Sequence, residues 1–459
     1  SSLINLPVGI NKIHSLMQAG EQYYLVGGSV RDALLSRSSQ DVDLTCSGDV
    51  KAIARRFADQ VSGSFFMLDE ERKACRVIAR NGEEERLVFD FTAIRGNGII
   101  DDLRERDFTI NAMAVDLRDP ETVIDPLGGG RDLAEKWLRP CSPTAFIDDP
   151  LRVIRAIRYS VNYDLRIEPQ TLHLLQQSVD RLGGVSHERK RDELFKILDK
   201  PKPWVAFSLL EHSGVLPYIS MGSLVDIRNA ISRLRTFTHL TSYLVAKDFS
   251  QEQDSLLLTS IIAGFKHSRE NLRGHLLQVN TSDRSRISLD GLISLFWQTD
   301  ISSIETLTQE LALSKDELDQ VMVVLQNRHC VSGLISNGST VDQRSIYKFF
   351  NRMGDAGIDL LLLALADTVN CPAAEINSDQ WLKMISVGQQ LVECWFERKD
   401  VVDPKPFLTG RDLMFEFDLV PGPLIGQLLD GLKEEQAAGN IKTRQSALEW
   451  IEGKLQPGF

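Results

Sequence analysis

The sequence predicts a small α/β domain followed by a long, almost entirely helical remainder. Two patterns lead to this fold class. Over residues 23–139, short runs of branched and aromatic residues alternate with helical segments, which is typical of a mixed sheet with flanking helices. After Pro143 the strand signals fade, and apolar residues recur at helical spacing almost to the end of the chain. A length of 459 residues fits about three domains.

The α/β part should begin with a short helix within residues 1–22, because Ile10, Ile13 and Leu16 lie at helical spacing. The run of aromatic and branched residues that follows favours a strand. The expected elements of this part are strands at 23–26, 64–68, 74–79 and 86–93 and a helix at 51–61.

Composition excludes several classes of protein. No apolar run is long enough to cross a bilayer, and the start of the chain carries no export signal, so we expect no membrane association. The six cysteines are scattered without a CxxC pair, which is typical of reduced thiols in a cytoplasmic protein and not of a disulfide framework or a zinc site. The net charge of −12 argues weakly against a nucleic-acid binder, although a local basic groove is compatible with it.

A glycine pair separates a predicted strand from a predicted helix. At Gly27 and Gly28, backbone N–H groups can approach a ligand without hindrance from side chains. Ser29 and Arg31 then open the helix, whose N-terminus favours an anion, and Arg31 adds a fixed positive charge. The stretch therefore predicts a phosphate-binding turn.

Two carboxylates follow on the next predicted strand. Asp41 and Asp43 are two residues apart, so both side chains should point to the same side. Such a pair suits a hard cation, and Mg²⁺ shared with phosphates is the expected guest. Glycine turns and paired Asp residues are each common at surfaces. Together in one short strand–turn–helix–strand stretch, they make a surface hairpin with incidental charges the weaker interpretation.

Asp90 is a third candidate carboxylate. It lies in an apolar strand, where a charged residue needs a reason, although an outward-facing solvated residue is nearly as good an interpretation. Arg106, Asp107 and Asn111 form a further polar group among apolar residues.

The second strong signal is a row of basic residues on a predicted helix. Asp149 and Pro150 fit the cap and the first turn of this helix. Arg152, Arg155 and Arg158 recur every third residue and stay on one broad face, where guanidinium groups beside a carboxylate can bind a nucleotide. A solvated basic face is the alternative, because the other side of the helix is apolar.

In this order, the motifs resemble those of the class II tRNA nucleotidyltransferases and the bacterial poly(A) polymerases related to them. The resemblance is close from about Tyr24 to Leu198 and fainter over the C-terminal part. The family's GGxVRD motif and DxD pair are matched by Gly27, Gly28, Val30, Arg31, Asp32, Asp41 and Asp43. Its RRD motif is matched in part by Glu105, Arg106 and Asp107, with Asn111 beyond it, and its EDxxR motif by Asp148, Asp149 and Arg152.

The resemblance implies roles for these positions. Arg106 matches an arginine that contacts the nucleotide. Asp149 and Arg152 match the pair that binds the incoming base in place of a nucleic-acid template. Arg155 and Arg158 match further nucleotide contacts.

The implied reaction is template-independent addition of CMP, AMP or both, from CTP or ATP, to the 3′ end of tRNA. Mg²⁺ ions held by Asp41 and Asp43 would lower the pKa of the terminal 3′-hydroxyl and steady the leaving pyrophosphate. Asp90 completes the candidate catalytic carboxylates. No protein partner can be inferred from the sequence.

One departure from the family bears on the nucleotides added. Members that add the final A carry a flexible loop between the third head strand and the RRD motif. Here the strand at 86–93 leads almost directly to the helix expected from Asp101, which favours an enzyme that adds only CC. A complete CCA-adding enzyme is the main alternative. A poly(A) polymerase, a non-catalytic tRNA-binding relative and a nucleotidyltransferase of small molecules or proteins are weaker ones.

The charge-rich segment 187–196, taken alone, is expected to be a solvated helix that could touch phosphates.

The resemblance also implies a division of the chain. The expected parts are a nucleotidyltransferase head at 1–140, a neck with base-reading helices at 141–200, an all-α body at 201–370 and an all-α, tRNA-binding tail at 371–459.

Overall fold

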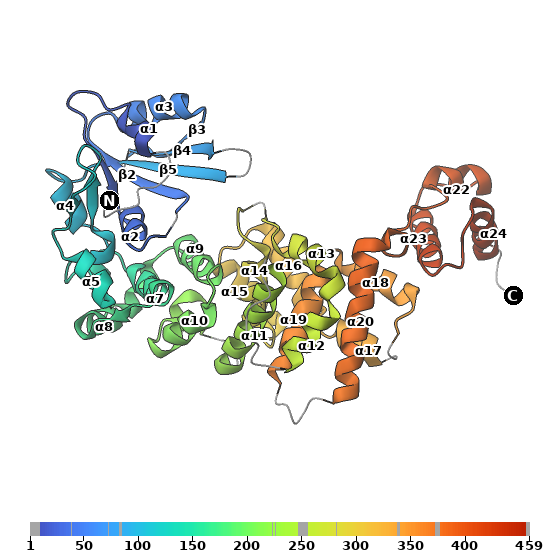
Figure 1. Cartoon of the computed structure of the whole chain (residues 1–459). Helices are drawn as coiled ribbons and strands as arrows, with labels where there is room; N and C mark the ends of the chain where they lie inside the picture. Colours follow the sequence, from blue (N-terminus) through green and yellow to red (C-terminus); the bar gives the residue numbers. More distant parts are fainter. Residues whose placement is uncertain are drawn as a thin grey trace. The chain divides into compact units, whose positions relative to one another are not determined.

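The computed structural model describes residues 10–37, 39–71, 73–81, 85–222, 224, 226–246, 256–280, 282–336, 340–371 and 377–455. The chain divides into two compact units (Figure 1). The first unit comprises Ser1–Val185 and Leu210–Tyr218, and the second comprises Ser186–Leu209 and Ile219–Phe459. No helix in the described part of the chain is long and apolar enough to cross a membrane.

The first unit contains every strand that the structure describes. The strands are β1 (Tyr23–Val26), β2 (Asp41–Cys46), β3 (Ser64–Asp69), β4 (Ala74–Asn81), β5 (Glu85–Ala93), β6 (Ala114–Asp116), β7 (Val123–Ile124), β8 (Trp137–Leu138) and β9 (Arg166–Ile167). The helices are α1 (Ile10–His14), α2 (Gly28–Leu34), α3 (Val50–Val61), α4 (Ile99–Arg104), η1 (Thr109–Asn111), α5 (Gly129–Glu135), α6 (Ala145–Asp148), α7 (Arg152–Tyr163), α8 (Pro169–Gln176) and η2 (Val179–Gly184).

Seven of these strands form one mixed sheet in the order β3-β4-β5-β2-β1-β6-β7. The pairing of β2 with β5 is parallel, and the other pairings in the sheet are antiparallel. β8 and β9 pair separately. The expected mixed sheet with flanking helices is therefore confirmed, including the strands expected at 23–26, 64–68, 74–79 and 86–93.

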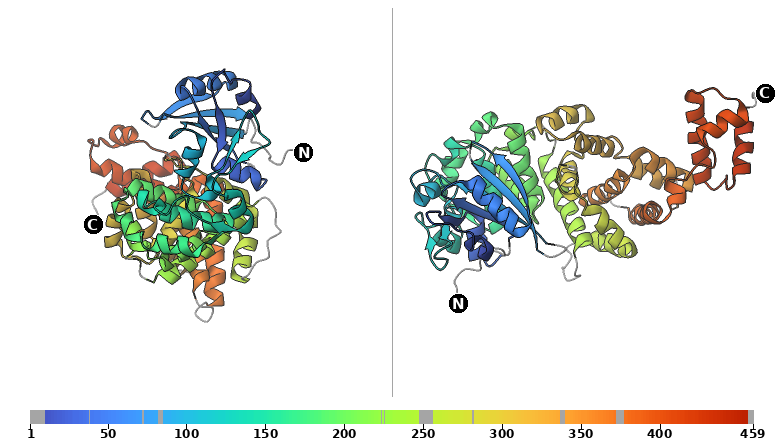
Figure 2. Two further views of the ribbon diagram at one scale, coloured as in Figure 1. Left: turned by 90° about the vertical axis from the view of Figure 1, so that its left-hand side faces the viewer. Right: turned by 90° about the horizontal axis from the view of Figure 1, so that it is seen from above.

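One face of the sheet is buried beneath α3, which lies on the same side as α1 (Figures 1 and 2). Phe57 of α3 packs on Phe89 and Phe91 of β5, with ring centroids 4.6 and 5.6 Å apart. The helix begins where the Asp49 side chain accepts a hydrogen bond from the Ala52 N–H, and it ends at Ser62, which has φ of 51°. Strand alternation then places Asp90 on the opposite face.

The secondary-structure elements described in the second unit are all helices, apart from an isolated β-bridge between Val279 and Ser285. Its helices are α9 (His187–Leu198), α11 (Ile227–Val245), α12 (Leu256–Gly264), η4 (Lys266–Ser268), α13 (Arg269–Leu276), α14 (Arg286–Phe296), α15 (Ile301–Glu310), α16 (Lys315–Gln326), α17 (Cys330–Ser336), α18 (Gln343–Met353), α19 (Ala356–Asn370), α20 (Ser378–Glu397), α21 (Lys399–Val402), α22 (Gly410–Phe417), α23 (Pro423–Ala437) and α24 (Arg444–Leu455). α10 (Pro203–His212) and η3 (Leu216–Ile219) include residues of both units. The expected helical remainder is thus confirmed.

Two helices of the first unit, α4 and α7, begin at other residues than expected. α7 begins at Arg152, two residues after Pro150, and Asp149 follows the short helix α6. α4 begins at Ile99, before the start expected at Asp101. These shifts are small. As a result, Asp149 lies at the C-terminal end of α6 and not at the N-terminal cap of α7, where it was expected.

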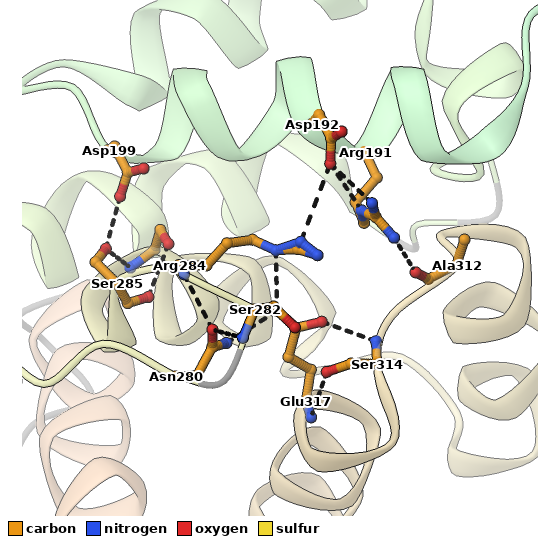
Figure 3. A network of polar contacts seen from close by, with 11 residues as sticks. Arg191, Asp192, Asp199, Asn280, Ser282, Arg284, Ser285, Ala312, Ser314 and Glu317 are labelled. Atoms are coloured by element: carbon orange, nitrogen blue, oxygen red, sulfur yellow. Dashed lines mark hydrogen bonds and ion pairs between the residues drawn. The ribbon is translucent and has the colours of Figure 1, made fainter. Parts of the chain in front are cut away.

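The charge-rich helix α9 is not simply solvated. Lys190 and Glu193 are buried, and Figure 3 shows a polar seam between α9 and the segments before α14 and α16. Arg191 of α9 donates to the Ala312 carbonyl, and Asp192 of α9 forms an ion pair with Arg284 at 4.0 Å. The expectation of a solvated helix was therefore wrong, because side chains distant in sequence supply partners for its charges.

Candidate active site

The carboxylates predicted for the metal lie side by side on the open face of the sheet. Asp41 and Asp43 are on β2, and the parallel pairing with β5 places Asp43 directly opposite Asp90. Paired residues on neighbouring strands point to the same side of a sheet. The structure therefore brings all three candidate catalytic carboxylates to one face.

The crowding of these charges has an electrostatic cost. Burial, together with the negative charges of Asp90 and Asp41, raises the pKa of Asp43 to about 6. Arg106 and Arg31 oppose this effect without cancelling it. A dication beside Asp43 would relieve the repulsion.

Arg76 is a neighbour of Asp90 that sequence analysis did not identify. It lies on β4 opposite Asp90, and its Nε and Nη2 donate to the two carboxylate oxygens of Asp90 at 2.7 and 2.8 Å. A planar guanidinium that binds both oxygens fixes the orientation of the carboxylate. Asp90 is thus held by Arg76, in a pair that only the register of β4 and β5 reveals.

The glycine turn lies against the carboxylates and against Arg106. Gly27 has φ of +64°, and a Cβ at this position would lie 2.9 Å from Nη1 of Arg106 and 3.7 Å from Oδ2 of Asp43. A Cβ at Gly28 would lie 3.5 Å from the same Asp43 oxygen. The Ser29 hydroxyl accepts a hydrogen bond from the Asp43 N–H at 2.8 Å and thereby ties α2 to β2.

Arg31 is buried within a network of its own. Its Nε donates to Asp32 at 3.0 Å, and its two terminal nitrogens donate to Asn111 and to the Tyr163 hydroxyl. The guanidinium also lies 4.1 Å from the centroid of the Tyr163 ring. These contacts join α2, η1 and α7. Direct binding of phosphate by Arg31 stays a prediction.

Arg106 is oriented by a buried acid that sequence reasoning missed. Asp102 accepts from Nη2 of Arg106 at 2.9 Å and from Nε of Arg95 at 2.9 Å. Burial opposes ionisation of Asp102, but these two arginines hold its pKa below the usual range. The only signal for Asp102 was a charge among apolar residues at the start of a helix.

Asp107 and Asn111 connect this region to α7. The Asp107 carboxylate is buried; it accepts from Nδ2 of Asn111 at 3.0 Å and from Nε of Arg155 at 2.9 Å. Burial alone would raise the pKa of Asp107, but Arg155 and Asn111 keep it below its usual range. Arg155 therefore positions α7, whatever it also does toward a nucleotide.

The remaining predicted residues lie at the beginning and middle of α7. Asp149 accepts from the Leu151 N–H at 3.2 Å. Arg152 donates to the Glu105 carbonyl at 3.0 Å, which places it next to the residue before Arg106. Arg158 is largely buried, with its guanidinium 4.4 Å from the Tyr159 ring centroid. Within the described part of the chain, the hydrogen bonds of the Arg152 guanidinium go to two backbone carbonyls, those of Ala145 and Glu105.

The residues present fit a magnesium ion shared with a substrate. Among the described residues, no group of three or more His, Cys, Asp or Glu side chains is placed to hold a metal ion. Mg²⁺ is commonly bound by one or two carboxylates, substrate phosphates and water. Asp41 and Asp43 supply the carboxylates, and the glycine turn beside Asp43 leaves room that a Cβ would fill.

Three family models match successive parts of the chain. The model of the poly(A) polymerase head domain matches residues 23–139. A model described as the probable RNA- and SrmB-binding site of polymerase A matches residues 164–220. A model of a putative tRNA nucleotidyltransferase domain 2 matches residues 291–451. The candidate carboxylates, the glycine turn and Arg106 all fall within the first match.

Known relatives extend over nearly the whole chain. The CC-adding tRNA nucleotidyltransferase of Geobacter sulfurreducens is 30% identical over 94% of this chain and 91% of its own. The A-adding tRNA nucleotidyltransferase of Deinococcus radiodurans is 31% identical over 93% of this chain and 94% of its own. The structure of the Thermotoga maritima CCA-adding enzyme with tRNA shares the fold, with a TM-score of 0.60 and 20% identity over 97% and 95% of the two chains. The chain therefore belongs to the class II tRNA nucleotidyltransferases, enzymes of the tRNA nucleotidyltransferase and poly(A) polymerase family.

Proposed function

We propose that this enzyme adds CMP from CTP to the 3′ end of tRNA and releases pyrophosphate, with Asp41 and Asp43 binding Mg²⁺. The observation that carries the proposal is the contact of the glycine turn with Asp43 and Arg106 on the open face of the sheet. The tRNA and CTP are supported by the relatives, which are CC-adding and A-adding tRNA enzymes, and by related structures solved with tRNA or CTP.

Each group in the site then has a task in phosphoryl transfer. Asp41 and Asp43 would hold Mg²⁺, which when bound would lower the pKa of the attacking 3′-hydroxyl and neutralise charge on the phosphates. The backbone N–H groups of Gly28 and Ser29 and the Arg106 guanidinium receive the triphosphate, and Ser29 holds the Asp43 backbone in place. Such chemistry needs mainly positioning and charge neutralisation.

Selection of the base is assigned to the start of α7. Arg152 carries a fork of donors and Asp149 is an acceptor three residues before it, which together match the hydrogen-bonding edge of a pyrimidine. Asp107, Asn111 and Arg155 hold this part of α7 in place. The base contacts themselves are part of the proposal.

The preference for CC addition rests on the segment between β5 and α4. β5 ends at Ala93 and α4 begins at Ile99, and Arg95 between them is bound to Asp102 at 2.9 Å. A segment this short and fixed gives no mobile loop that could refit the pocket from CTP to ATP. Relatives at similar identity add CC or A, so they do not select between these activities.

We also propose the four-part division of head, neck, body and tail at 1–140, 141–200, 201–370 and 371–459, with tRNA binding in the last. The family model at 23–139 supports the head, whereas the matches at 164–220 and 291–451 extend across the proposed boundaries between neck and body and between body and tail. A cytoplasmic location is proposed from the six cysteines, all of which are free thiols.

Incorporation of labelled nucleotide tests the function. Purified enzyme with Mg²⁺ is given CTP or ATP and tRNA that ends at the discriminator base, at CC or at CCA. Two CMP residues and no AMP are expected. AMP added to tRNA ending in CC would show a complete CCA-adding enzyme, long adenylate tracts a poly(A) polymerase, and binding without incorporation a non-catalytic relative.

A further inference from the structure

Three charged residues on neighbouring strands lie next to one another on the open face of the sheet. Arg76 on β4 pairs in register with Asp90 on β5, and Asp90 pairs in register with Asp43 on β2. Neighbouring strands are about 4.8 Å apart, so Arg76 stands about 10 Å from Asp43 across Asp90. Asp90 thus lies between a cation and the expected metal ligands.

Arg76 binds both oxygens of the Asp90 carboxylate. Each carboxylate oxygen accepts one hydrogen bond from the guanidinium, at 2.7 and 2.8 Å. The negative charges of Asp41 and Asp43 act on Arg76 in the same sense as Asp90. The oxygens that could complete a three-carboxylate metal site are therefore turned to Arg76, which agrees with the absence of such a group among the described residues.

We propose that Arg76 keeps Asp90 out of the metal site in the nucleotide-free enzyme, so that the metal binds tightly only together with a nucleotide. The inference rests on the proposed binding of metal by Asp41 and Asp43. A triphosphate offers other anionic oxygens to the guanidinium, and binding it frees Asp90 to turn toward the cation. Arg76 is then a positioning residue that acts through Asp90.

Binding of Mn²⁺ to the nucleotide-free, full-length protein, followed by electron paramagnetic resonance, tests the proposal. Arg76→Gln should bind Mn²⁺ about tenfold more tightly than the unmodified enzyme, since it loses a repelling charge and gains a carboxylate ligand. The charge-balanced variant R76Q/D90N should return to the affinity of the unmodified enzyme. Arg118→Gln is the matched control: Arg118, in the turn after β6, binds both oxygens of Asp116 at 3.1 and 2.7 Å, and its loss should change nothing.

The same titration with a non-hydrolysable CTP analogue tests the coupling. The analogue should tighten Mn²⁺ binding strongly in the unmodified enzyme. The effect should be smaller in R76Q, because Asp90 is already released there and can bind the cation without the analogue. In R76Q/D90N the affinity with the analogue should fall below that of the unmodified enzyme. Arg76→Lys, which keeps the charge but cannot bind both oxygens, should show a smaller gain than R76Q and serves if R76Q does not fold.

Two results would overturn the proposal: an unchanged Mn²⁺ affinity in folded R76Q, or a gain in R76Q that persists in R76Q/D90N. A failure of the proposed function looks different. Asp41→Asn and Asp43→Asn would then bind Mn²⁺ as well as the unmodified enzyme does, regardless of the residue at position 76.

Discussion

At the residue scale, the site is a compromise between stability and chemistry. Asp43 lies beside two other carboxylates, Asp41 and Asp90, an arrangement that we propose attracts a dication. The same arrangement raises its pKa to about 6 and works against folding when no metal is present. Sites that bind cations therefore tend to be weak points of the metal-free protein.

Asp43→Asn should lower the activity of the enzyme and raise the stability of the metal-free protein. Incorporation of CMP should fall about 10³-fold or more, because charge stabilisation of the transferred phosphate is lost, while tRNA binding should remain. The metal-free variant should also unfold at higher urea concentration than the unmodified enzyme. Because the folded pKa of Asp43 is raised, this advantage should be absent near pH 4, grow as the pH rises through 6 and stay constant above it. A variant less stable at pH 7.5 in EDTA would contradict this assignment.

Gly27→Ala tests the turn. A positive φ with a side chain costs about 1–2 kcal/mol, and the new Cβ must also displace Arg106, which lies 2.9 Å away. Both the midpoint of thermal unfolding and the affinity for CTP should therefore fall. Gly20 has φ of +88° and open space around it, so Gly20→Ala is the matched control. It should lose similar stability and keep its affinity, and equal loss of affinity in both variants would refute the role of the turn.

At the scale of helices, the second unit contains a buried carboxyl pair. Asp359 on α19 accepts from His275 on α13 and from Arg286 on α14, each at 2.6 Å. Burial would raise the pKa of Asp359, but these two partners hold it below the usual range. Burial and the charge of Asp359 raise the pKa of Asp290 well above its usual range. Oδ2 of Asp290 has no donor near it, which fits a protonated Asp290 that donates to Asp359.

Asp290→Asn and Asp359→Asn should have opposite effects on urea unfolding. An unfolded Asp290 ionises above its usual pKa of about 3.9, whereas the raised pKa keeps the folded one protonated to higher pH, so rising pH destabilises the unmodified enzyme. Asp290→Asn removes that dependence, and its advantage should grow as the pH rises above about 4. Asp359→Asn removes the buried anion that Arg286 and His275 share, although Arg286 keeps Asp355 at 2.7 Å, and it should cost about 3–5 kcal/mol at pH 7. If Asp290→Asn were destabilising at pH 8, Asp290 would be ionised in the folded protein.

Sequence reasoning succeeded where the relevant contacts are local. The alternation of β5 placed Asp90 on the face opposite Phe89 and Phe91, and β1, β2 and β5 were expected where they lie. Arg76 was missed because its partner is set by strand register, which local patterns do not encode. The burial of Arg31 could not be foreseen either, since its partner Tyr163 lies 132 residues away.

At the scale of the whole molecule, the residues proposed for metal and nucleotide all belong to the first unit, and the Asp290–Asp359 pair belongs to the second. Ligands stabilise the part of a protein that binds them. A ligand of the first unit and a mutation in the second should therefore change the stabilities of the two units separately.

Calorimetry should reveal this division as two transitions. Mg²⁺ with a non-hydrolysable CTP analogue should raise only one of them, and Asp359→Asn should lower only the other. Asp43→Asn should abolish the response to the ligand without moving the second transition. A single transition that shifts as a whole in every case would show that the two units unfold together.

The position of β2 within the sheet has a further consequence. It lies between β5 and β1, and the sheet is closed on one face by α3. Leu44, Thr45 and Cys46 pair with strands on both sides, whereas Asp41 to Asp43 pair with β5 alone. Amide protons in such a strand exchange with solvent only when the whole unit opens, whereas those of edge strands such as β3 and β7 exchange through local fraying. The three residues of β2 that directly follow the carboxylates proposed to hold the metal should thus be among the last of the first unit to take up deuterium.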